Sequence, residues 1–157
     1  MNKESAAKLR EMLKLHEGLR LKPYQCIAGR WTIGYGHNLE AHGKTNPESI
    51  TLEEAERLLD EDIRTAENQC MMRMPYFATL DDVRQAVLID MCFNLGINGL
   101  IGFRKTLAAV ETRQYTRAAV EMVDSKWAAQ VKGRANRLSN MMAYGKWPTD
   151  IAFKGAA

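Results

Sequence analysis

The chain has 157 residues, 46% hydrophobic and 26% charged, a composition typical of a soluble globular protein with one domain. Its 22 lysines and arginines outnumber its 19 aspartates and glutamates, and the resulting charge of +3 suits a polyanionic partner but is too small to identify one. No run approaches the roughly 20 apolar residues of a membrane span, and three widely spaced cysteines argue against a disulfide framework.

The first predicted element is a short amphipathic helix over residues 5–17, with Ser5 as its N-cap and Gly18 as its stop. The charged start of the chain lacks the apolar core and cleavage site of a signal peptide. We therefore expect synthesis in a cytoplasm and no stable association with a membrane.

Residues 19–39 mix β-forming side chains with Pro23 and several glycines, which predicts a small twisted antiparallel sheet of hairpins. Cys26 falls in a loop or turn of this sheet. Residues 40–49 are predicted to form a polar loop. The other two cysteines, Cys70 and Cys92, lie within helical patterns and are expected in the core.

A capping box opens the next helix, because Thr51 is followed three residues later by Glu54. This helix is five or six turns long, enough to join two lobes. Thr79 and Asp82 repeat the start signal before a central helix that is apolar on nearly every face. Further short helices are expected near 103–112, 115–124 and 134–144.

This order of elements predicts an α+β protein, with a cleft between the sheet and the helical bundle. We expect a single domain over residues 1–157. Its sheet lobe would cover about 15–50, and its helical lobe, about 70–157, would pack with the N-terminal helix.

Metal and nucleic-acid chemistry find little support. His16 and Glu17 begin like the HExxH motif of zinc proteases, but position 20 is arginine. The three histidines (16, 37 and 42) and the cysteines show no tight ligand spacing, so no metal or other cofactor is expected. The basic segment 132–137 lacks interleaved aromatic residues and is interpreted as a solvated helix start rather than a nucleic-acid contact.

Glu17 is the candidate acid. It ends a predicted helix, where the negative end of the helix dipole disfavours a carboxylate. A glycosidase needs such an acid, still protonated near neutral pH, and an opposite group that positions water or stabilises charge at the sugar. A glutamate at a helix end is also commonly just solvated, so the residues alone leave both interpretations open.

A family resemblance favours the catalytic interpretation. The segments LHEGLRLKPY and GRWTIGYGH, on either side of Cys26, closely resemble the endolysin family of phage lysozymes, glycoside hydrolase family 24. That family's signature is a glutamate, eight residues, an aspartate or cysteine, five residues and a threonine, and Glu17, Cys26 and Thr32 match it in full. The resemblance runs from about residue 9 to 147, through LDDVRQAVLIDMCFNLGINGLIGFRKTL and GRANRLSNMMAYGKW.

The resemblance implies a two-lobed lysozyme fold and a muramidase (EC 3.2.1.17) that hydrolyses the β-1,4 bond between N-acetylmuramic acid and N-acetylglucosamine. Glu17 would be the general acid, and Thr32 would hold the attacking water. Cys26 stands where the T-even phage members carry aspartate. As a thiolate it could be a general base, an electrostatic partner or a nucleophile, and as a neutral thiol it could only orient water weakly.

The resemblance also implies two substrate-binding residues, Phe93 and Thr106, although Phe93 is equally consistent with core packing on the central helix. His37 is expected to tie the sheet together by hydrogen bonds. Trp127 and Trp147 are expected to be core aromatics of the helical lobe.

Two other functions stay open on the sequence. A lytic transglycosylase also uses one acid but works without water, which Thr32 argues against. An inactive peptidoglycan-binding domain would be expected to lack Glu17 or Thr32. As a lysozyme the chain would act as a monomer on peptidoglycan strands, and a holin would give it access to the wall so that host lysis releases phage progeny.

Overall fold

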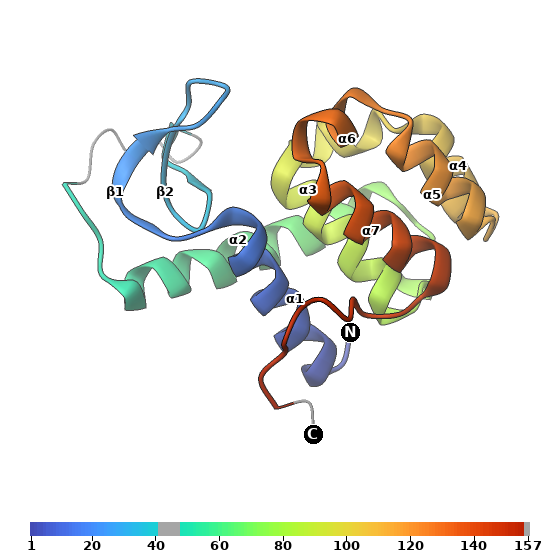
Figure 1. Ribbon diagram of the computed structural model, residues 1–157, viewed down its shortest axis with the longest axis horizontal. Helices are drawn as coiled ribbons and strands as arrows, with labels where there is room; N and C mark the ends of the chain where they lie inside the picture. Colours follow the sequence, from blue (N-terminus) through green and yellow to red (C-terminus); the bar gives the residue numbers. More distant parts are fainter. Residues whose placement is uncertain (41–47, 156–157) are drawn as a thin grey trace. The chain divides into compact units, whose positions relative to one another are not determined.

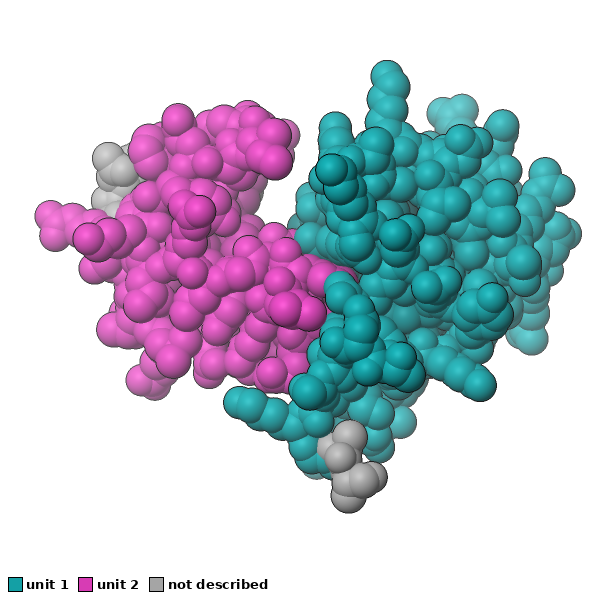
Figure 2. All heavy atoms as spheres, viewed as in Figure 1, with its two compact units in different colours: residues 1–8, 66–157 teal, residues 9–65 magenta. Residues whose placement is uncertain are grey.

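The structure is a computed structural model that describes residues 1–40 and 48–155, so most of the predicted polar loop over 40–49 lies outside the described residues. The described part contains seven α-helices and one three-stranded antiparallel sheet, which is the α+β lysozyme fold that the sequence predicts (Figure 1). Contacts divide the chain into unit 1, Met1–Lys8 and Ala66–Ala157, and unit 2, Leu9–Thr65 (Figure 2). That the units form one domain with a cleft stays a prediction.

Unit 2 contains the sheet, whose strands β1 (Arg20–Gln25), β2 (Trp31–Gly34) and β3 (His37–Asn38) are hydrogen-bonded in that order. Both pairings are antiparallel, as predicted. Thr32 on the central strand β2 pairs with Tyr24 on β1 and Asn38 on β3. The apolar core of this unit includes Leu9, Met12, Leu13, Ile33, Leu39 and Leu59.

Helix α1 (Lys3–Glu17) begins two residues earlier than predicted, and the predicted N-cap was wrong. Asn2, rather than Ser5, caps it, because the Asn2 Oδ1 accepts the Ser5 N–H at 2.8 Å. The predicted stop is confirmed. Gly18 adopts φ +69° and donates its N–H to the Lys14 carbonyl, which closes the last turn.

Helix α2 (Leu52–Arg73) starts in unit 2 with the predicted capping box. The Thr51 Oγ1 accepts the Glu54 N–H at 3.1 Å, and the Glu54 carboxylate accepts the Thr51 N–H at 3.0 Å. Because both bonds fix the same turn, they define where α2 begins. Asp62, which meets the sheet, lies on the same helix.

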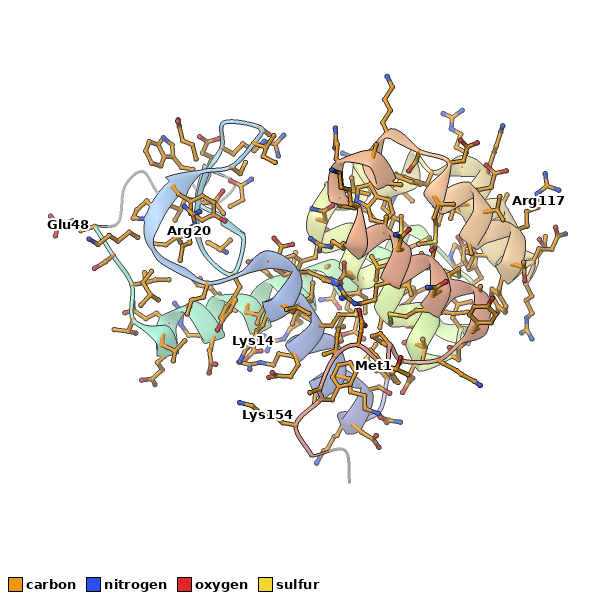
Figure 3. All side chains as sticks on the ribbon, in the orientation of Figure 1. Met1, Lys14, Arg20, Glu48, Arg117 and Lys154 are labelled. Carbon is orange, nitrogen blue, oxygen red and sulfur yellow. The ribbon has the colours of Figure 1, made fainter. Side chains whose placement is uncertain are left out.

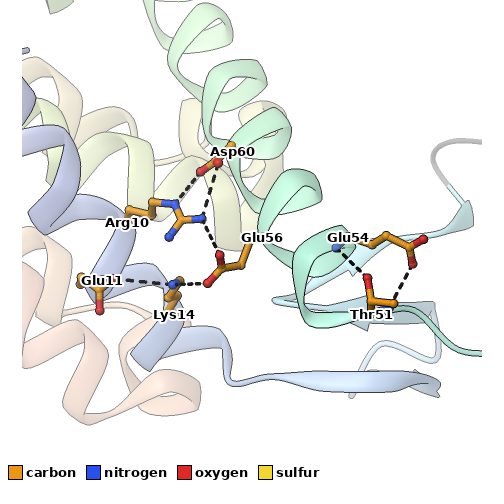
Figure 4. A network of polar contacts seen from close by, with 7 residues as sticks. All are labelled: Arg10, Glu11, Lys14, Thr51, Glu54, Glu56 and Asp60. Atoms are coloured by element: carbon orange, nitrogen blue, oxygen red, sulfur yellow. Dashed lines mark hydrogen bonds and ion pairs between the residues drawn. The ribbon is translucent and has the colours of Figure 1, made fainter.

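A network of ion pairs joins α1 to α2 within unit 2 (Figure 4). Lys14, labelled in Figure 3, donates to the Glu56 carboxylate at 2.7 Å, and the Arg10 Nε lies 2.6 Å from the Asp60 Oδ1. Arg10 also reaches Glu56 at 3.6 Å. Each pair is partly exposed and weak by itself, but the pairs share partners and so fix the relative position of the two helices.

Unit 1 is helical: beyond the end of α2 it contains η2 (Phe77–Thr79), α3 (Asp82–Ile101), α4 (Arg104–Glu111), α5 (Tyr115–Val123), α6 (Lys126–Val131) and α7 (Gly133–Tyr144). The sequence did not predict α6. Helix α3 is central as predicted, since its residues 85–92 are all buried. The predicted start signal at Thr79 was wrong: Asp81 caps α3 by accepting the Arg84 N–H at 3.0 Å, and Thr79 belongs to η2.

A buried ion pair links α3 to α7. Asp90 is 0% exposed, and the Arg134 Nε donates to its carboxylate at 2.8 Å. Arg134 is itself buried, so the interpretation of segment 132–137 as solvated was wrong for this residue, although α7 does begin there. Arg134 has this role because a buried carboxylate needs a charged partner.

Two further core predictions have different outcomes. Cys70 and Cys92 are buried as predicted, and Trp127 is buried with its indole N–H donating to Asn94 at 2.7 Å. The core assignment of Trp147 was wrong, because it lies partly exposed in the segment after α7. Its ring packs edge-on against Phe153.

No single helix in the described part of the chain is long and apolar enough to cross a membrane. Helices α3 and α4, bent by 100° relative to each other, reach the required length and composition only when taken together.

Replacing Thr51 with alanine removes the hydroxyl that caps α2. We expect the free energy of unfolding to fall by about 1 kcal/mol and Tm to fall by roughly 2–4 °C. Thermal unfolding followed by circular dichroism measures both. Thr51→Ser retains the hydroxyl and should stay close to the wild type, so equal losses in the two variants would contradict the capping role.

Candidate active site

Glu17 lies at the C-terminal end of α1, where Gly18 turns the chain toward β1. Its carboxyl group lies directly against Gly36, in the turn between β2 and β3. A Cβ atom at position 36 would be only 2.6 Å from the Glu17 Oε2 and 3.0 Å from its Cδ. Gly36 also has φ +71°, which other residues rarely adopt. The missing side chain therefore gives the Glu17 carboxyl its position.

Cys26 lies at the tip of the β1–β2 hairpin and is partly exposed. Its backbone N–H donates to the Arg30 carbonyl at 2.9 Å, and the Gly29 N–H donates to the Cys26 carbonyl at 2.8 Å, which closes the turn. Slight burial opposes ionisation of the thiol. Hydrogen bonds from the backbone N–H groups of Arg30 and Ala28, and from the Thr32 hydroxyl, outweigh it and lower the pKa of Cys26 below its ordinary value.

Thr32 is 6% exposed on the central strand. Its hydroxyl donates to the Arg30 carbonyl at 3.0 Å and is also within hydrogen-bonding reach of the Cys26 sulfur. A hydroxyl has one proton and two acceptor lone pairs, so it can give its proton to either group and still accept from a water molecule. This versatility is what a water-positioning residue requires.

Tyr24 belongs to the same site, and sequence reasoning missed it. It pairs with Thr32 across β1 and β2. Burial raises the pKa of its phenol, and the negative charges of Glu17 and Cys26 raise it further, which places the three side chains near one another. Tyr24 stands two residues before Cys26, but β1 ends at Gln25 and Cys26 lies in the turn, so strand alternation alone does not assign both side chains to one face.

Arg20 covers the ring of Tyr24, with its guanidinium carbon 4.6 Å from the ring centroid. Arg20, labelled in Figure 3, begins β1. Its positive charge partly offsets the effect of the nearby carboxylate on the Tyr24 pKa. This stacked pair holds the phenol on the first strand of the hairpin.

His37 forms the predicted structural hydrogen bond. Its Nδ1 lies 2.7 Å from the Asp62 Oδ2 on α2, and the imidazole is almost fully buried. The bond fastens β3 to α2 within unit 2. Since β3 follows directly after Gly36, it also fixes the turn that touches Glu17.

Phe93 and Thr106 belong to unit 1, whereas Glu17, Cys26 and Thr32 belong to unit 2. Phe93 lies partly exposed on α3, and Thr106 on α4 is 2% exposed. Their roles in substrate binding stay predictions.

No group of three or more His, Cys, Asp and Glu side chains that could hold a metal ion occurs within residues 1–40 and 48–155. The candidate site residues of unit 2 offer a carboxyl group on Glu17, a thiol on Cys26 and hydroxyl groups on Thr32 and Tyr24. These groups can donate a proton and orient a water molecule.

A family model described as phage lysozyme matches residues 14–141, which include Glu17, Cys26 and Thr32. The chain belongs to the phage lysozyme family. Among curated proteins, this lysozyme is 28% identical to a probable T4-type lysozyme 1 of Dictyostelium discoideum, over 87% of this chain and 94% of that protein. It is 33% identical to an endolysin of Acyrthosiphon pisum secondary endosymbiont phage 1, over 83% and 85% of the two chains.

A third relative is much longer than this lysozyme. The pre-baseplate central spike protein Gp5 of Enterobacteria phage T4 is 31% identical over 86% of this chain, but the match covers only 27% of that protein. The family's fold therefore occurs both as most of a chain and as one part of a larger one.

Replacing Gly36 with alanine should displace the Glu17 carboxyl, because the added Cβ and the Oε2 atom cannot both keep their places. We expect wall-degrading activity to fall on the order of 10²-fold, as misplaced catalytic groups do. The rate of reducing-end release from purified peptidoglycan measures the loss.

Gly96→Ala is the matched control. Gly96 also has a positive φ, +73°, but an added Cβ would meet nothing within 4 Å. Both variants should lose a similar 1–3 kcal/mol or so of stability through backbone strain. Equal activity losses would show that strain, rather than contact with Glu17, explains the effect.

The Cys26 thiol should ionise at a lower pH than an ordinary thiol. Alkylation by iodoacetamide requires the thiolate, so its rate should rise with pH through a midpoint lower than that of free cysteine under the same conditions. Thr32→Val removes one hydrogen bond to the sulfur and should move this midpoint to higher pH. Mass spectrometry of the labelled peptide gives the rate, and the buried Cys70 and Cys92 provide unreactive internal controls. A wild-type midpoint at or above that of free cysteine would contradict the assignment.

Proposed function

We propose that this lysozyme hydrolyses the β-1,4 bond between N-acetylmuramic acid and N-acetylglucosamine in peptidoglycan, the reaction of EC 3.2.1.17. The observation that carries the proposal is the position of the Glu17 carboxyl, held against Gly36 at a helix end beside Tyr24. A positioned acid and a hydroxyl that can hold a water molecule, here Glu17 and Thr32 of unit 2, are the minimum that this hydrolysis requires.

In the proposed mechanism Glu17 protonates the glycosidic oxygen as the bond to the sugar breaks. Thr32 holds the water that attacks the sugar carbon, using the lone pairs left free by its bond to Arg30. Cys26 acts as a thiolate, either taking the proton of that water or stabilising positive charge on the sugar. The lowered pKa of Cys26 supports a charged role. Attack by a held water, rather than by sulfur, would invert the anomeric centre.

The proposed substrate contacts in unit 1 are Phe93 and Thr106. Phe93 has an exposed edge on α3 that suits contact with a sugar. Thr106 is nearly fully buried, so its contact with substrate would need a local opening of α4.

Two alternatives compete with hydrolysis. A lytic transglycosylase would produce anhydro sugar ends and would have no use for the water-binding hydroxyl of Thr32. A wall-binding module would have no use for a fixed acid. The presence of both Glu17 and Thr32 in one site favours hydrolysis.

In the phage life cycle we propose that the chain is a monomeric endolysin that lyses the host and releases phage progeny. It would be made in the host cytoplasm and would reach the wall after a holin permeabilises the membrane. The match to 85% of a protein named endolysin supports this role over that of a spike component. Wall degradation by live cells that express the chain without any holin would argue against this dependence.

The decisive experiment compares wild type with Glu17→Gln on purified peptidoglycan. If Glu17 is the general acid, release of reducing ends should fall roughly 10²- to 10⁴-fold. Glu11→Gln, an acid-to-amide change on the same helix, is the control and should keep its activity. Anhydro products from the wild type would favour the transglycosylase, and binding without cleavage would favour the wall-binding module.

Two substitutions in the same assay test the thiol. Cys26→Asp keeps a negative charge at this position, and Cys26→Ser keeps only a neutral hydroxyl. Activity retained by Cys26→Asp and lost by Cys26→Ser would establish a charged role. Equal activity in both variants would exclude a charged role for Cys26.

A further inference from the structure

Unit 1 contains a concave surface that none of the residues proposed for catalysis lines. A cavity of about 570 Å³ separates α7 from the segment Lys146–Asp150 that follows it. This volume lies within the range of about 300–1,000 Å³ that is usual for small-ligand sites. We call it the α7 groove. It contains none of Glu17, Cys26, Thr32, Phe93 and Thr106.

The groove is built by a reversal of the chain. Gly145, with φ +63°, ends α7, and the following segment turns back along that helix (Figure 1). Arg137, two turns back on α7, donates to both carboxylate oxygens of Asp150, at 3.1 and 2.8 Å. The ring of Trp147 packs edge-on against Phe153, 5.8 Å away, and the Lys8 ammonium lies 5.9 Å from each of the two rings. These contacts fix the wall of the groove.

The helix side of the groove presents a regular row of groups. Asn136, Asn140 and Tyr144 line it at intervals of four residues, so they form one stripe along α7. All three are exposed, and Tyr144 is 72% exposed. Packing within unit 1 therefore does not explain the position of the exposed Tyr144 ring, which follows the two exposed amides along the helix.

The chemistry of this row suits an N-acetylated sugar. A side-chain amide offers both a donor and an acceptor, which matches the N–H and C=O of an acetamido group. The electron-rich face of an aromatic ring attracts the C–H edges on the face of a sugar ring. The repeated spacing of the groups suits a repeating polymer better than a compact metabolite.

The charges of the groove argue against an acidic peptide as the ligand. Arg137 is paired with Asp150, whose carboxylate is itself 62% exposed beside the groove. Lys146 is the other cation among the lining residues. An incoming carboxylate would therefore meet a negative charge as well as a positive one.

We propose that the α7 groove binds an N-acetylated glycan strand, as a second carbohydrate site that holds the protein on the wall polymer. The inference rests on the proposed function in that its ligand is the same polymer as the substrate. A second site on one polymer raises the local concentration of that polymer at the first site.

The test is titration of the full chain with tetra-N-acetylchitotetraose, followed by amide chemical shifts in nuclear magnetic resonance spectra. The wild type should show saturable shifts in residues 133–150, separate from any shifts around Glu17. Tyr144→Ala and Asn140→Ala should each weaken this binding roughly five- to tenfold, because each removes one contact with the sugar. Met72→Ala, which removes another exposed large side chain from unit 1, should not change it.

The same samples are assayed for reducing-end release from peptidoglycan, so that the two proposals can fail separately. Groove shifts without any cleavage would leave the second site standing and refute the proposed hydrolysis. Normal cleavage without groove shifts would overturn the second site. Equal weakening by Met72→Ala, or groove shifts with a free stem peptide in place of the oligosaccharide, would also overturn it.

Discussion

The arrangement of unit 2 depends on the close approach of a helix end and a glycine. The turn after β2 can reach the Glu17 carboxyl only because Gly36 has no side chain. Helix α2 supports both partners of this contact. Its Glu56 and Asp60 form ion pairs with α1, which carries Glu17, and its Asp62 binds His37, which follows Gly36. The acid and the turn against it therefore share one support, and a change in the position of α2 would affect both.

Unit 1 depends on a different constraint, the charge of Asp90 in the middle of its central helix. A carboxylate with no exposure is costly unless a cation reaches it, and Arg134 on α7 does so. This pair fixes which face of α7 points inward. Leu138 and Met141 follow Arg134 into the interior. The opposite face, which carries Asn140 and its neighbours, is left to line the groove on the outside.

The sequence predicted features that local chemistry determines. The capping box at Thr51 forms as expected, because both of its residues act within a single helical turn. The caps at Ser5 and Thr79 were wrong because a competing side chain, Asn2 or Asp81, stands a few residues away. Local signals of similar strength do not decide between such candidates.

Features that depend on contacts between distant residues were beyond the sequence. The role of Gly36 depends on its contact with Glu17, nineteen positions earlier in the chain. The motif GYG alone does not indicate this contact. Trp147 was expected in a core because tryptophan usually is buried. Its partly exposed position follows from the chain reversal at Gly145 and the pairing of Asp150 with α7. The candidate site was predicted from the family's spacing of Glu17, Cys26 and Thr32. Such a signature reflects contacts between distant residues that local patterns do not show.

The cysteine beside the acid can now be understood in terms of its surroundings. An aspartate would be ionised at neutral pH without help, whereas an ordinary thiol, with a pKa of about 8.5, would be mostly neutral. Slight burial opposes ionisation of the Cys26 thiol, but hydrogen bonds from the backbone N–H groups of Arg30 and Ala28 and from the Thr32 hydroxyl outweigh it and lower the pKa. The Gly29 N–H closes the turn on the Cys26 carbonyl, so that Ala28 and Arg30 lie within the same tight hairpin. Hydrogen bonds from this backbone, rather than a second carboxylate, thus favour a charged group at this position of the proposed site.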